Sequence, residues 1–280
     1  MPELAYVNGK IGPVEEAVVP IEDRGYNFGD AVYEYVASYG GKLFRLEDHL
    51  ARLSRSMAGL SFPPVSIDRV RDAITELYQA SGIERAGIYL QLSRGVDRRD
   101  HPFPKAPVPQ LVMTVRPLKE KPPHLRKDGA AVITVTDFRW GRCDLKTVQL
   151  LPNVMAKQQA LDSGAFDAVF VSDAGIVREA TSSNFFIASG GVLVTHPLTE
   201  NILAGITRQV LLEIAAEKKI PVKERFFTLE EVFAADEAFL SGTTTEVIPV
   251  VTIDGNPVGD GNVGPLSEKL FAALRQAAQK

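Results

Sequence analysis

The sequence predicts an α+β fold in which each half of the chain forms a layer of sheet and a layer of helix. The first observation is a pair of hairpin dipeptides, Asn8-Gly9 and Gly40-Gly41, each between runs of strand-forming residues. The second is a set of separate segments in which apolar residues recur every three or four positions, as on one face of a helix. Because such turns join antiparallel strands, we expect antiparallel sheet in the first part of the chain.

The first third of the chain is predicted to contain paired strands, then two helices, then two further strands. The first helix begins near Glu47, where Leu50 and Leu53 lie on one face. In the second helix, Ser66 is suited to the N-cap and Gly82 to the end of the helix. The strands are expected at residues 4–12 and 31–46, around the two turns, and at residues 86–95 and 109–118.

A connection between two domains is predicted near residue 120. The segment RPLKEKPPHLRKDG (residues 116–129) contains prolines and charged residues without an apolar period, which is typical of an exposed linker. We therefore expect a smaller N-terminal α+β domain at residues 1–119, a linker at residues 120–124, and a larger C-terminal α+β domain at residues 125–280 that carries Lys146.

The second part of the chain is predicted to mix short strands with two helices. A strand is expected at residues 130–138, and several short strands at residues 167–196, with turns at Asp173-Ala-Gly and Gly190-Gly191. Residues 147–164 and 206–220 have the composition or spacing of helices. Pro152 fits best in the first turn of its helix, because an interior proline removes a backbone hydrogen bond.

Composition excludes several classes of partner. A formal net charge of −4 and a pI near 5.7 give no support to nucleic-acid binding, which favours a basic domain. No run approaches the ~18 apolar residues that a membrane-spanning helix needs, and the N-terminus does not resemble a secretion signal. The single cysteine, Cys143, fits a reducing compartment. We therefore expect a cytoplasmic protein.

Lys146 and Glu179 are the residues that first suggest a chemistry. Lys146 lies in RWGRCDLKTVQLLPNVMAKQQA (residues 139–160), where a strand-like run gives way to a helical one, and Glu179 lies on a later predicted strand, in VREATSSN. A lysine amine can form a Schiff base with a carbonyl cofactor, and a carboxylate can keep the ring nitrogen protonated. The pair suits pyridoxal 5'-phosphate, although most lysines are simply solvated surface charges.

Two segments could hold the phosphate of such a cofactor. Gly205-Ile206-Thr207 opens a predicted helix, whose free amides and dipole favour an anion. The segment SGTTTE (residues 241–246) offers amides and the Thr243 hydroxyl, although it also suits an ordinary polar turn. Arg52 could hold two phosphate oxygens, although its place opposite the apolar stripe of its helix predicts a solvated side chain.

Motifs of other enzyme classes are missing from the sequence. It contains no Gly-x-Ser-x-Gly elbow and no Walker-type or Rossmann glycine string. The four histidines, at positions 49, 101, 124 and 196, lack metal-ligand spacing, so we expect no metal.

Taken together, these segments resemble the fold-type IV pyridoxal-phosphate enzymes, and within them the bacterial D-amino-acid aminotransferases. The resemblance runs nearly from end to end and implies the two-domain architecture of that group. The matching segments, besides those around Lys146 and Glu179, are EDRGYNFGDAVYE (22–34), HLARL (49–53), SRGVDRRDHPFP (93–104), THP (195–197), ILAGITR (202–208) and SGTTTEVIPV (241–250).

The resemblance implies roles for residues that bind the cofactor. Lys146 would form the Schiff base and move the substrate proton, and Glu179 would pair with the pyridine nitrogen. The phosphate would be bound by Arg52, Ile206, Thr207 and Thr243, while Ser182 and Leu203 would line the cofactor pocket.

The resemblance also implies roles in substrate binding. Tyr33, Arg99 and His101 match the residues that gather the substrate α-carboxylate in the D-specific branch, with Arg99 and His101 reaching across from the partner subunit of a homodimer. Without the resemblance, Tyr33 would be interpreted as a core aromatic and Arg99 as a surface charge. The departures from the family pattern, which bear on substrate preference, are Gly141, Ala180, and the charges of Arg98 and Asp100 beside Arg99.

The implied reaction is transamination between a D-amino acid and a 2-oxo acid, for example D-alanine and 2-oxoglutarate giving pyruvate and D-glutamate. The alternatives that share the fold are a branched-chain L-aminotransferase, an (R)-amine aminotransferase and 4-amino-4-deoxychorismate lyase. The Arg-x-His feature at residues 99–101 argues against the lyase. The alternative that is not an enzyme is a non-catalytic cofactor-binding or interaction protein.

Overall fold

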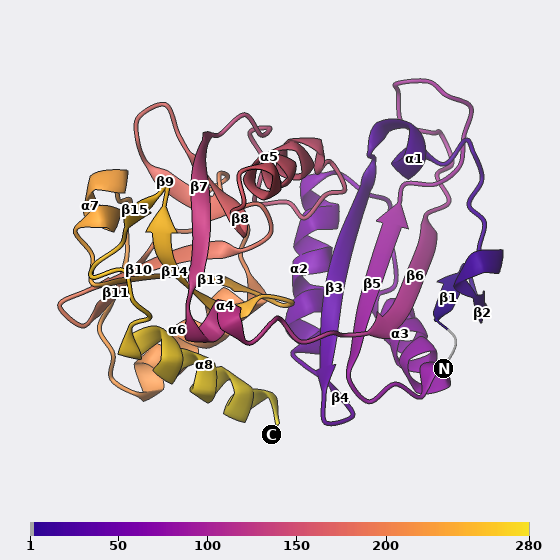
Figure 1. Cartoon of the computed structure of the whole chain (residues 1–280). Coiled ribbons are helices and arrows are strands. Elements are labelled where there is room, and N and C mark those ends of the chain that lie inside the picture. Colours follow the sequence, from indigo (N-terminus) through magenta and orange to yellow (C-terminus); the bar gives the residue numbers. More distant parts are fainter. Residues whose placement is uncertain (1–2, 280) are drawn as a thin grey trace. The chain divides into compact units, whose positions relative to one another are not determined.

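The computed structural model describes residues 3–279, which fold into two compact units (Figure 1). The N-terminal unit consists of the chain up to Lys119 together with Leu145–Gln149. The C-terminal unit consists of Glu120–Asp144 and the chain from Leu150 onward. Both units combine sheet with helices, so the predicted α+β fold is confirmed.

The sheet of the N-terminal unit is antiparallel and, within the described residues, has six strands in the order β2-β1-β6-β5-β3-β4. Both predicted hairpins are confirmed, because Val7 pairs with Lys10 and Tyr39 pairs with Lys42 across the two turns. The strands are β1 (Leu4–Val7), β2 (Lys10–Pro13), β3 (Ala31–Tyr39), β4 (Lys42–Leu43), β5 (Ala86–Ser93) and β6 (Gln110–Pro117).

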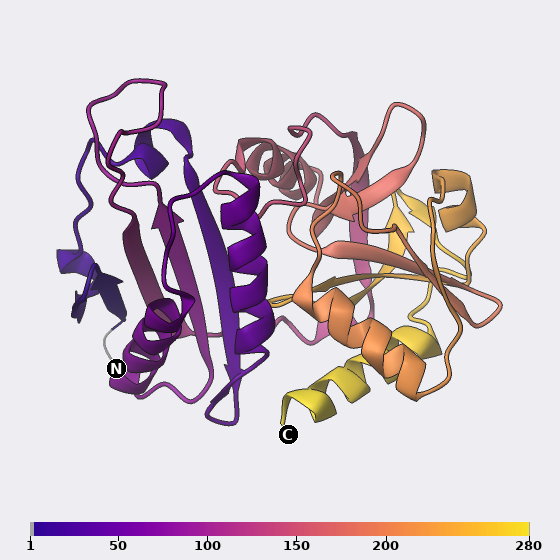
Figure 2. The same ribbon diagram turned by 180° about the vertical axis from the view of Figure 1, so that it is seen from behind.

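Helices α2 (Leu46–Gly59) and α3 (Ile67–Ser81) cover one face of this sheet (Figure 2). The Ser66 hydroxyl accepts a hydrogen bond from the Arg69 amide, and Gly82 ends α3 in the left-handed conformation, as predicted. The two helices and the sheet share one buried apolar cluster, which includes Leu53, Leu77 and Ile88. A shorter helix, α1 (Arg24–Phe28), precedes β3, and a 3-10 turn spans Val14–Glu16.

The segment that carries Lys146 belongs to the N-terminal unit, whereas we expected it in the C-terminal domain. The Tyr33 amide donates to the Lys146 carbonyl (3.0 Å), and the Val148 amide donates to the Ala31 carbonyl (3.2 Å). The reason is that the edge of the sheet at β3 is partly open. β4 pairs only with residues 38 and 39, at the C-terminal end of β3. The segment that carries Lys146 pairs with the N-terminal end of β3, where Val32 faces Thr147. Lys146 itself lies in irregular structure, well after the preceding strand ends at Thr136.

The sheet of the C-terminal unit closes on itself. Within the described residues its strand order is β12-β11-β10-β13-β14-β7-β8-β9, with β15 paired to β14. A further pairing of Asn184 on β10 with Glu179 on β9 joins the end of this order back to its middle. The strands are β7 (Ala130–Thr136), β8 (Asp167–Val171), β9 (Val177–Ala180), β10 (Asn184–Ser189), β11 (Val192–Thr195), β12 (Val222–Glu224), β13 (Glu237–Gly242), β14 (Glu246–Ile253) and β15 (Asn256–Pro257).

Five helices accompany this sheet within the described residues: α4 (His124–Lys127), α5 (Leu151–Asp162), α6 (Ile206–Glu217), α7 (Leu229–Phe233) and α8 (Pro265–Ala278). Pro152 lies in the first turn of α5, as predicted. Residues 120–123 form neither helix nor strand, and α4 begins at His124. The domain bounds 1–119 and 125–280 remain a prediction. No helix within residues 3–279 is long and apolar enough to cross a membrane.

Candidate active site

Lys146 and Tyr33, two of the predicted site residues, contact each other within the N-terminal unit. The Lys146 ammonium nitrogen lies 4.1 Å from the centre of the Tyr33 ring. The Lys146 backbone is held at both its groups: its amide donates to the Ser56 hydroxyl (3.0 Å), and its carbonyl accepts from the Tyr33 amide. The lysine side chain is half-buried. Both backbone groups of Lys146 are therefore fixed by hydrogen bonds beside β3.

Arg52, predicted to be solvated, is buried in a polar cluster with Glu34 and His49. The Arg52 Nε and Nη2 atoms donate to the two Glu34 oxygens, at 2.8 and 2.7 Å. His49 Nδ1 lies 2.7 Å from Glu34 Oε2. Helix α2 therefore has a buried polar face besides its apolar one, and the Arg52 guanidinium is oriented by a bidentate carboxylate.

The charges of this cluster are set by its burial and by its pairing. Burial opposes ionisation of Glu34, but Arg52 and His49 outweigh it and lower the pKa of its carboxyl from 4.5 to about 2. Burial also lowers the pKa of His49 below its usual 6.5; Glu34 acts against this shift, and the charges of Arg52 and Lys146 add to it. At neutral pH the cluster therefore holds an ionised carboxylate, a guanidinium and a neutral imidazole.

Arg99 and His101 lie together on an exposed loop of the N-terminal unit, and both contact Phe28. The Arg99 guanidinium carbon is 5.2 Å from the centre of the Phe28 ring, and the His101 ring centre is 5.7 Å from it. The structure therefore brings together the two residues expected to bind the substrate carboxylate. Tyr33, the third residue expected there, contacts Lys146.

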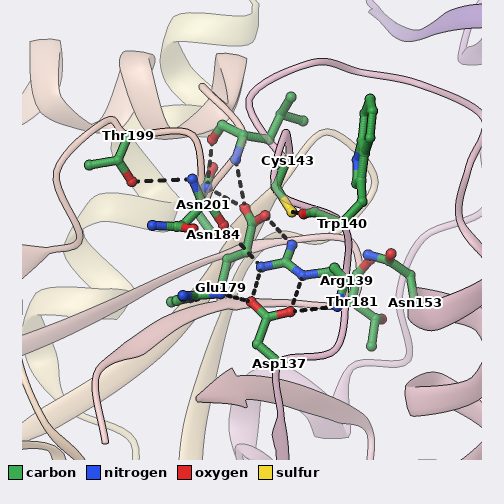
Figure 3. Close-up of polar contacts among 12 residues, drawn as sticks. Asp137, Arg139, Trp140, Cys143, Asn153, Glu179, Thr181, Asn184, Thr199 and Asn201 are labelled. Carbon is green, nitrogen blue, oxygen red and sulfur yellow. Dashed lines mark hydrogen bonds and ion pairs between the residues drawn. The ribbon is translucent and has the colours of Figure 1, made fainter. Parts of the chain in front are cut away.

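Glu179 is buried on β9 of the C-terminal unit and accepts three hydrogen bonds (Figure 3). Arg139 Nη1 donates to its Oε1 (2.6 Å), while the Asn184 side-chain amide and the Leu203 backbone amide each donate to its Oε2 (3.1 Å). Burial raises the pKa of the Glu179 carboxyl, and Arg139 and the Leu203 amide act against that rise. Three donors are the partners that an ionised carboxylate requires in a buried place.

Arg139 is itself held by Asp137 (Figure 3), which also binds Arg178. Its Nε and Nη2 atoms donate to the two Asp137 oxygens, at 3.0 and 2.8 Å, and Arg178 donates to Asp137 Oδ2 (2.6 Å). Burial opposes ionisation of Asp137, but the two arginines outweigh it and lower the pKa of the carboxyl. Asp137 thereby holds the Arg139 guanidinium in the orientation in which it donates to Glu179.

The predicted phosphate-binding helix, α6, begins directly after Gly205, with Ile206 and Thr207 both buried. Because glycine has no side chain, it cannot cap the first amides of the helix, which remain suited to an anion. A Cβ atom at Gly205 would lie only 2.0 Å from Asn184 Oδ1. The start of α6 is therefore packed directly against a residue that supports Glu179.

Thr243 lies half-buried in the turn between β13 and β14. The buried Ser241 hydroxyl has no hydrogen-bond partner within residues 3–279. The hydroxyl groups of Ser183 and Thr245 lie 2.9 Å apart, and Ser182 is exposed. A Cβ at Gly242 would lie 3.2 Å from both Ser182 O and Ser183 Oγ, so this turn and the segment after β9 are in close contact.

Glu246 ends this turn in a left-handed conformation, with φ of +57°. Its buried carboxylate pairs with Arg126 from α4, and with Arg275 Nε from α8 at 2.8 Å. Left-handed backbone is uncommon for a residue with a side chain, so these pairs must help to hold it. The turn that contains Thr243 is therefore held at its C-terminal end by the ion pairs of Glu246.

These two groups of residues fit pyridoxal 5'-phosphate by the chemistry of their donors. The C-terminal unit offers a buried carboxylate for a ring nitrogen. For a phosphate it offers the uncapped start of α6 and the Ser241 hydroxyl, which lacks a partner among the described residues. The N-terminal unit offers the Lys146 amine for a carbonyl carbon.

Several residues of these clusters were not predicted from the sequence, although three of them left a signal. Glu34 lies on the same buried face of β3 as Val32 and Val36. A carboxylate between two apolar residues of that face is the signal. Asp137 and Arg139 are two positions apart, just after a strand. Asn184 had no signal, because its role depends on the pairing of β9 with β10, which is a tertiary feature.

Comparison with protein-family models gives a match to the family described as amino-transferase class IV, over residues 31–253. Among similar proteins, the D-alanine aminotransferase of Bacillus licheniformis is 41% identical over 271 residues, which are 96% of this chain and 95% of the relative. The D-alanine aminotransferase of Staphylococcus aureus strain COL is 39% identical over 269 residues, with the same coverage of both chains.

Similar solved structures include enzymes with another substrate in their names. The branched-chain aminotransferase of the thermophilic archaeon Thermoproteus uzoniensis superposes with a TM-score of 0.88 and 28% identity, over 99% of this chain and 95% of that one. An aminotransferase from Mycobacterium tuberculosis, solved in its PLP-bound form, superposes with a TM-score of 0.86 and 26% identity, over 99% and 98% of the two chains. The predicted fold-type IV architecture is thereby confirmed.

Proposed function

The chain belongs to the class IV aminotransferase family, and we propose that it transfers amino groups between D-amino acids and 2-oxo acids. It is a pyridoxal-phosphate-dependent transaminase, as its family and its PLP-bound neighbour indicate. The observation that carries D-specificity is the pair of relatives named D-alanine aminotransferase, which are 41% and 39% identical over nearly the whole chain. D-Alanine with 2-oxoglutarate is therefore the first substrate pair to test.

In this proposal Lys146 is the catalytic residue. When bound, the cofactor supplies a carbonyl carbon that binds an amine and a ring that accepts the electrons left when a Cα–H bond breaks. Lys146 would hold the cofactor through its amine, and the same amine, when free, would accept the proton from the substrate Cα and later give it back. The two backbone hydrogen bonds of Lys146 anchor the residue from which this amine extends.

Other residues would bind the ring and the phosphate of the cofactor. Glu179 would pair with the pyridine nitrogen and keep its proton in place, while Arg139 and Asn184 hold the carboxylate. Ser182 and Leu203 line the cofactor pocket. The phosphate would be bound by Arg52, the amides of Ile206 and Thr207, and Thr243, through charge-assisted hydrogen bonds.

Handedness follows from where the substrate carboxylate is held. The Cα–N bond is tied to the cofactor, and the Cα–H bond must point at Lys146, so two directions remain for the carboxylate and the side chain. Exchanging those two groups inverts the enantiomer. Arg99, His101 and Tyr33 would hold the carboxylate on one side, where only a carboxylate can form charge-assisted hydrogen bonds with them.

We further propose a cytoplasmic homodimer in which Arg99 and His101 serve the site of the partner subunit. The exposed apolar side chains of Val18, Ile21 and Tyr26, each 75% exposed or more, are surface that a second copy could cover. The proposed partners are otherwise small D-amino acids and 2-oxo acids.

A branched-chain L-aminotransferase is the second candidate, favoured by the superposition on the Thermoproteus uzoniensis enzyme at a TM-score of 0.88. Its identity to this chain, 28%, is below that of the D-alanine aminotransferases. The pairing of Arg99 with His101 on one loop supports the D-specific assignment over this one and over the lyase.

The test is a panel of D- and L-amino acids with a fixed 2-oxo acid acceptor, run on the wild type, Arg99→Ala and the surface control Arg55→Lys. We expect turnover of D-alanine and not of L-leucine, and a fall in kcat/KM of about 10- to 100-fold for Arg99→Ala, since a charge-assisted hydrogen bond is lost. Arg55→Lys should match the wild type. Turnover of L-leucine with no D-alanine activity would assign the chain to the branched-chain group.

A further inference from the structure

The loop that carries Arg99 and His101 has little structure of its own. Residues 97–103 form neither helix nor strand, and all of them are exposed. Their local side-chain bonds are confined to neighbours, such as the Asp100 carboxylate with the His101 amide. A loop of this kind has many accessible conformations, so a fixed placement of Arg99 and His101 requires an anchor from outside the loop.

Arg24 provides such an anchor. Its Nη1 atom donates to the carbonyls of Asp100 (2.7 Å) and Pro102 (3.3 Å), and its Nη2 atom donates to the carbonyl of His101 (3.2 Å). Three consecutive carbonyls of the loop are therefore bound by one guanidinium. The Arg24 side chain is buried although the loop is exposed, so these bonds are shielded from competing water.

Arg24 is in turn held from two sides. Its Nε atom donates to Asp30 Oδ2 (2.9 Å), which also accepts from Arg94 Nε (2.8 Å). Arg94 lies over the Phe103 ring at 3.6 Å, which holds the far end of the loop. The Arg24 guanidinium lies 4.7 Å from the centre of the Phe28 ring, the same ring that Arg99 and His101 contact.

We infer that Arg24 is a positioning residue for substrate recognition: by binding the carbonyls of residues 100–102 it sets the pose in which Arg99 and His101 meet a substrate carboxylate. This inference rests on the proposed function, since it assigns a role to the loop that the function needs. Arg24 itself touches neither substrate nor cofactor in this account.

A lysine cannot replace Arg24 in this role. Three carbonyls and a carboxylate are bound here by three nitrogens of a planar fork, whereas an ammonium is a single point on a flexible stem. Arg24→Lys keeps the buried positive charge beside Asp30 and removes most of the loop contacts. The substitution therefore separates the charge of Arg24 from its geometry.

The experiment measures steady-state kinetics with D-alanine and 2-oxoglutarate for wild-type holoenzyme, R24K, R99A, the double variant and the surface control R55K. We expect R24K to raise the KM for D-alanine about tenfold, as loss of charge-assisted contacts implies, with a smaller change in kcat. In the R99A background, R24K should have little further effect, because both changes act on the same carboxylate contact. Peptides spanning residues 96–108 should exchange amide hydrogen faster in R24K than in R55K.

The outcomes separate this inference from the proposed function. If the wild type does not use D-alanine, or R99A matches the wild type, the proposed function is wrong and the inference falls with it. If R99A is impaired while R24K matches R55K, or if the effects of R24K and R99A are additive, only the inference is overturned. R24Q serves as a second variant, and a large loss of Tm in both R24K and R24Q would assign Arg24 to stability alone.

Discussion

His49 is buried next to a carboxylate and nevertheless favours its neutral form. Burial is the largest cause of its lowered pKa, and the charges of Arg52 and Lys146 add to it, while Glu34 acts against it. In the neutral ring Nδ1 carries the proton that it donates to Glu34. The structure therefore keeps a second cation out of the cluster that holds Arg52.

An NMR titration of the histidine ring signals tests this assignment, with His49→Asn identifying the resonance. We expect the His49 midpoint below 6.5, its usual value. The sign for stability follows from linkage: an unfolded chain binds the proton at a higher pH than the folded one, so this contribution is present above pH 6.5 and is lost as the pH falls through the folded pKa. A midpoint at or above 6.5 would contradict the account.

At this scale the sequence indicated Lys146 and Glu179 and missed what surrounds them. The two residue types suit the chemistry, so they could be singled out from sequence alone. Arg52 was predicted to be solvated because the helical stripe accounts only for apolar contacts, whereas Glu34 on β3 draws it into the interior. The hydrogen-bond partners of such a residue lie on other helices or strands, so a local sequence pattern cannot predict them.

The start of α6 is the element on which the cofactor side of the C-terminal unit depends. Gly205 leaves the first amides of the helix without a side-chain cap and lets Asn184 approach closely. Asn184 in turn donates to Glu179 Oε2 and to the Leu203 carbonyl. One glycine therefore links the helix expected to bind phosphate with the carboxylate expected to bind the ring.

Gly205→Ala is expected to weaken binding of pyridoxal 5'-phosphate by at least about tenfold. The new Cβ would lie 2.0 Å from Asn184 Oδ1, so Asn184 must move and Glu179 loses a donor to its charged form. A titration of apoenzyme followed by absorbance measures the affinity. Gly12→Ala is the control, since its Cβ would meet nothing within 4 Å. Equal affinities of the two variants would show that the contact has no bearing on the cofactor.

Among the elements, four helices and both hairpins were predicted from the sequence, whereas the capped helix α7 and the amphipathic helix α8 were not. Helices α2, α3, α5 and α6 and both hairpins fall where the apolar spacing and the glycines place them. The short helix α1 was missed because five residues are too few to show a period. It begins at Arg24, whose role depends on a loop more than seventy positions away in sequence.

At the scale of the whole molecule, the α+β class follows from the order of strands and helices, but the grouping of residues does not. Leu145–Gln149 is far from β3 in sequence and completes an edge of its sheet. Edge pairing over such a separation has no local signal, which is why Lys146 was expected in the other domain. The pairing of Glu179 with Asn184, which closes the second sheet, also depends on tertiary structure and could not be predicted from a local pattern.

The central claim is that Lys146 is the residue that carries the cofactor. Reduction of the holoenzyme with borohydride, followed by digestion and mass spectrometry, tests it most directly, because the reduced link survives the analysis. We expect the pyridoxyl group on the peptide that contains Lys146, and no label in Lys146→Ala. A label on any other lysine, or an unlabelled wild type, would contradict the account.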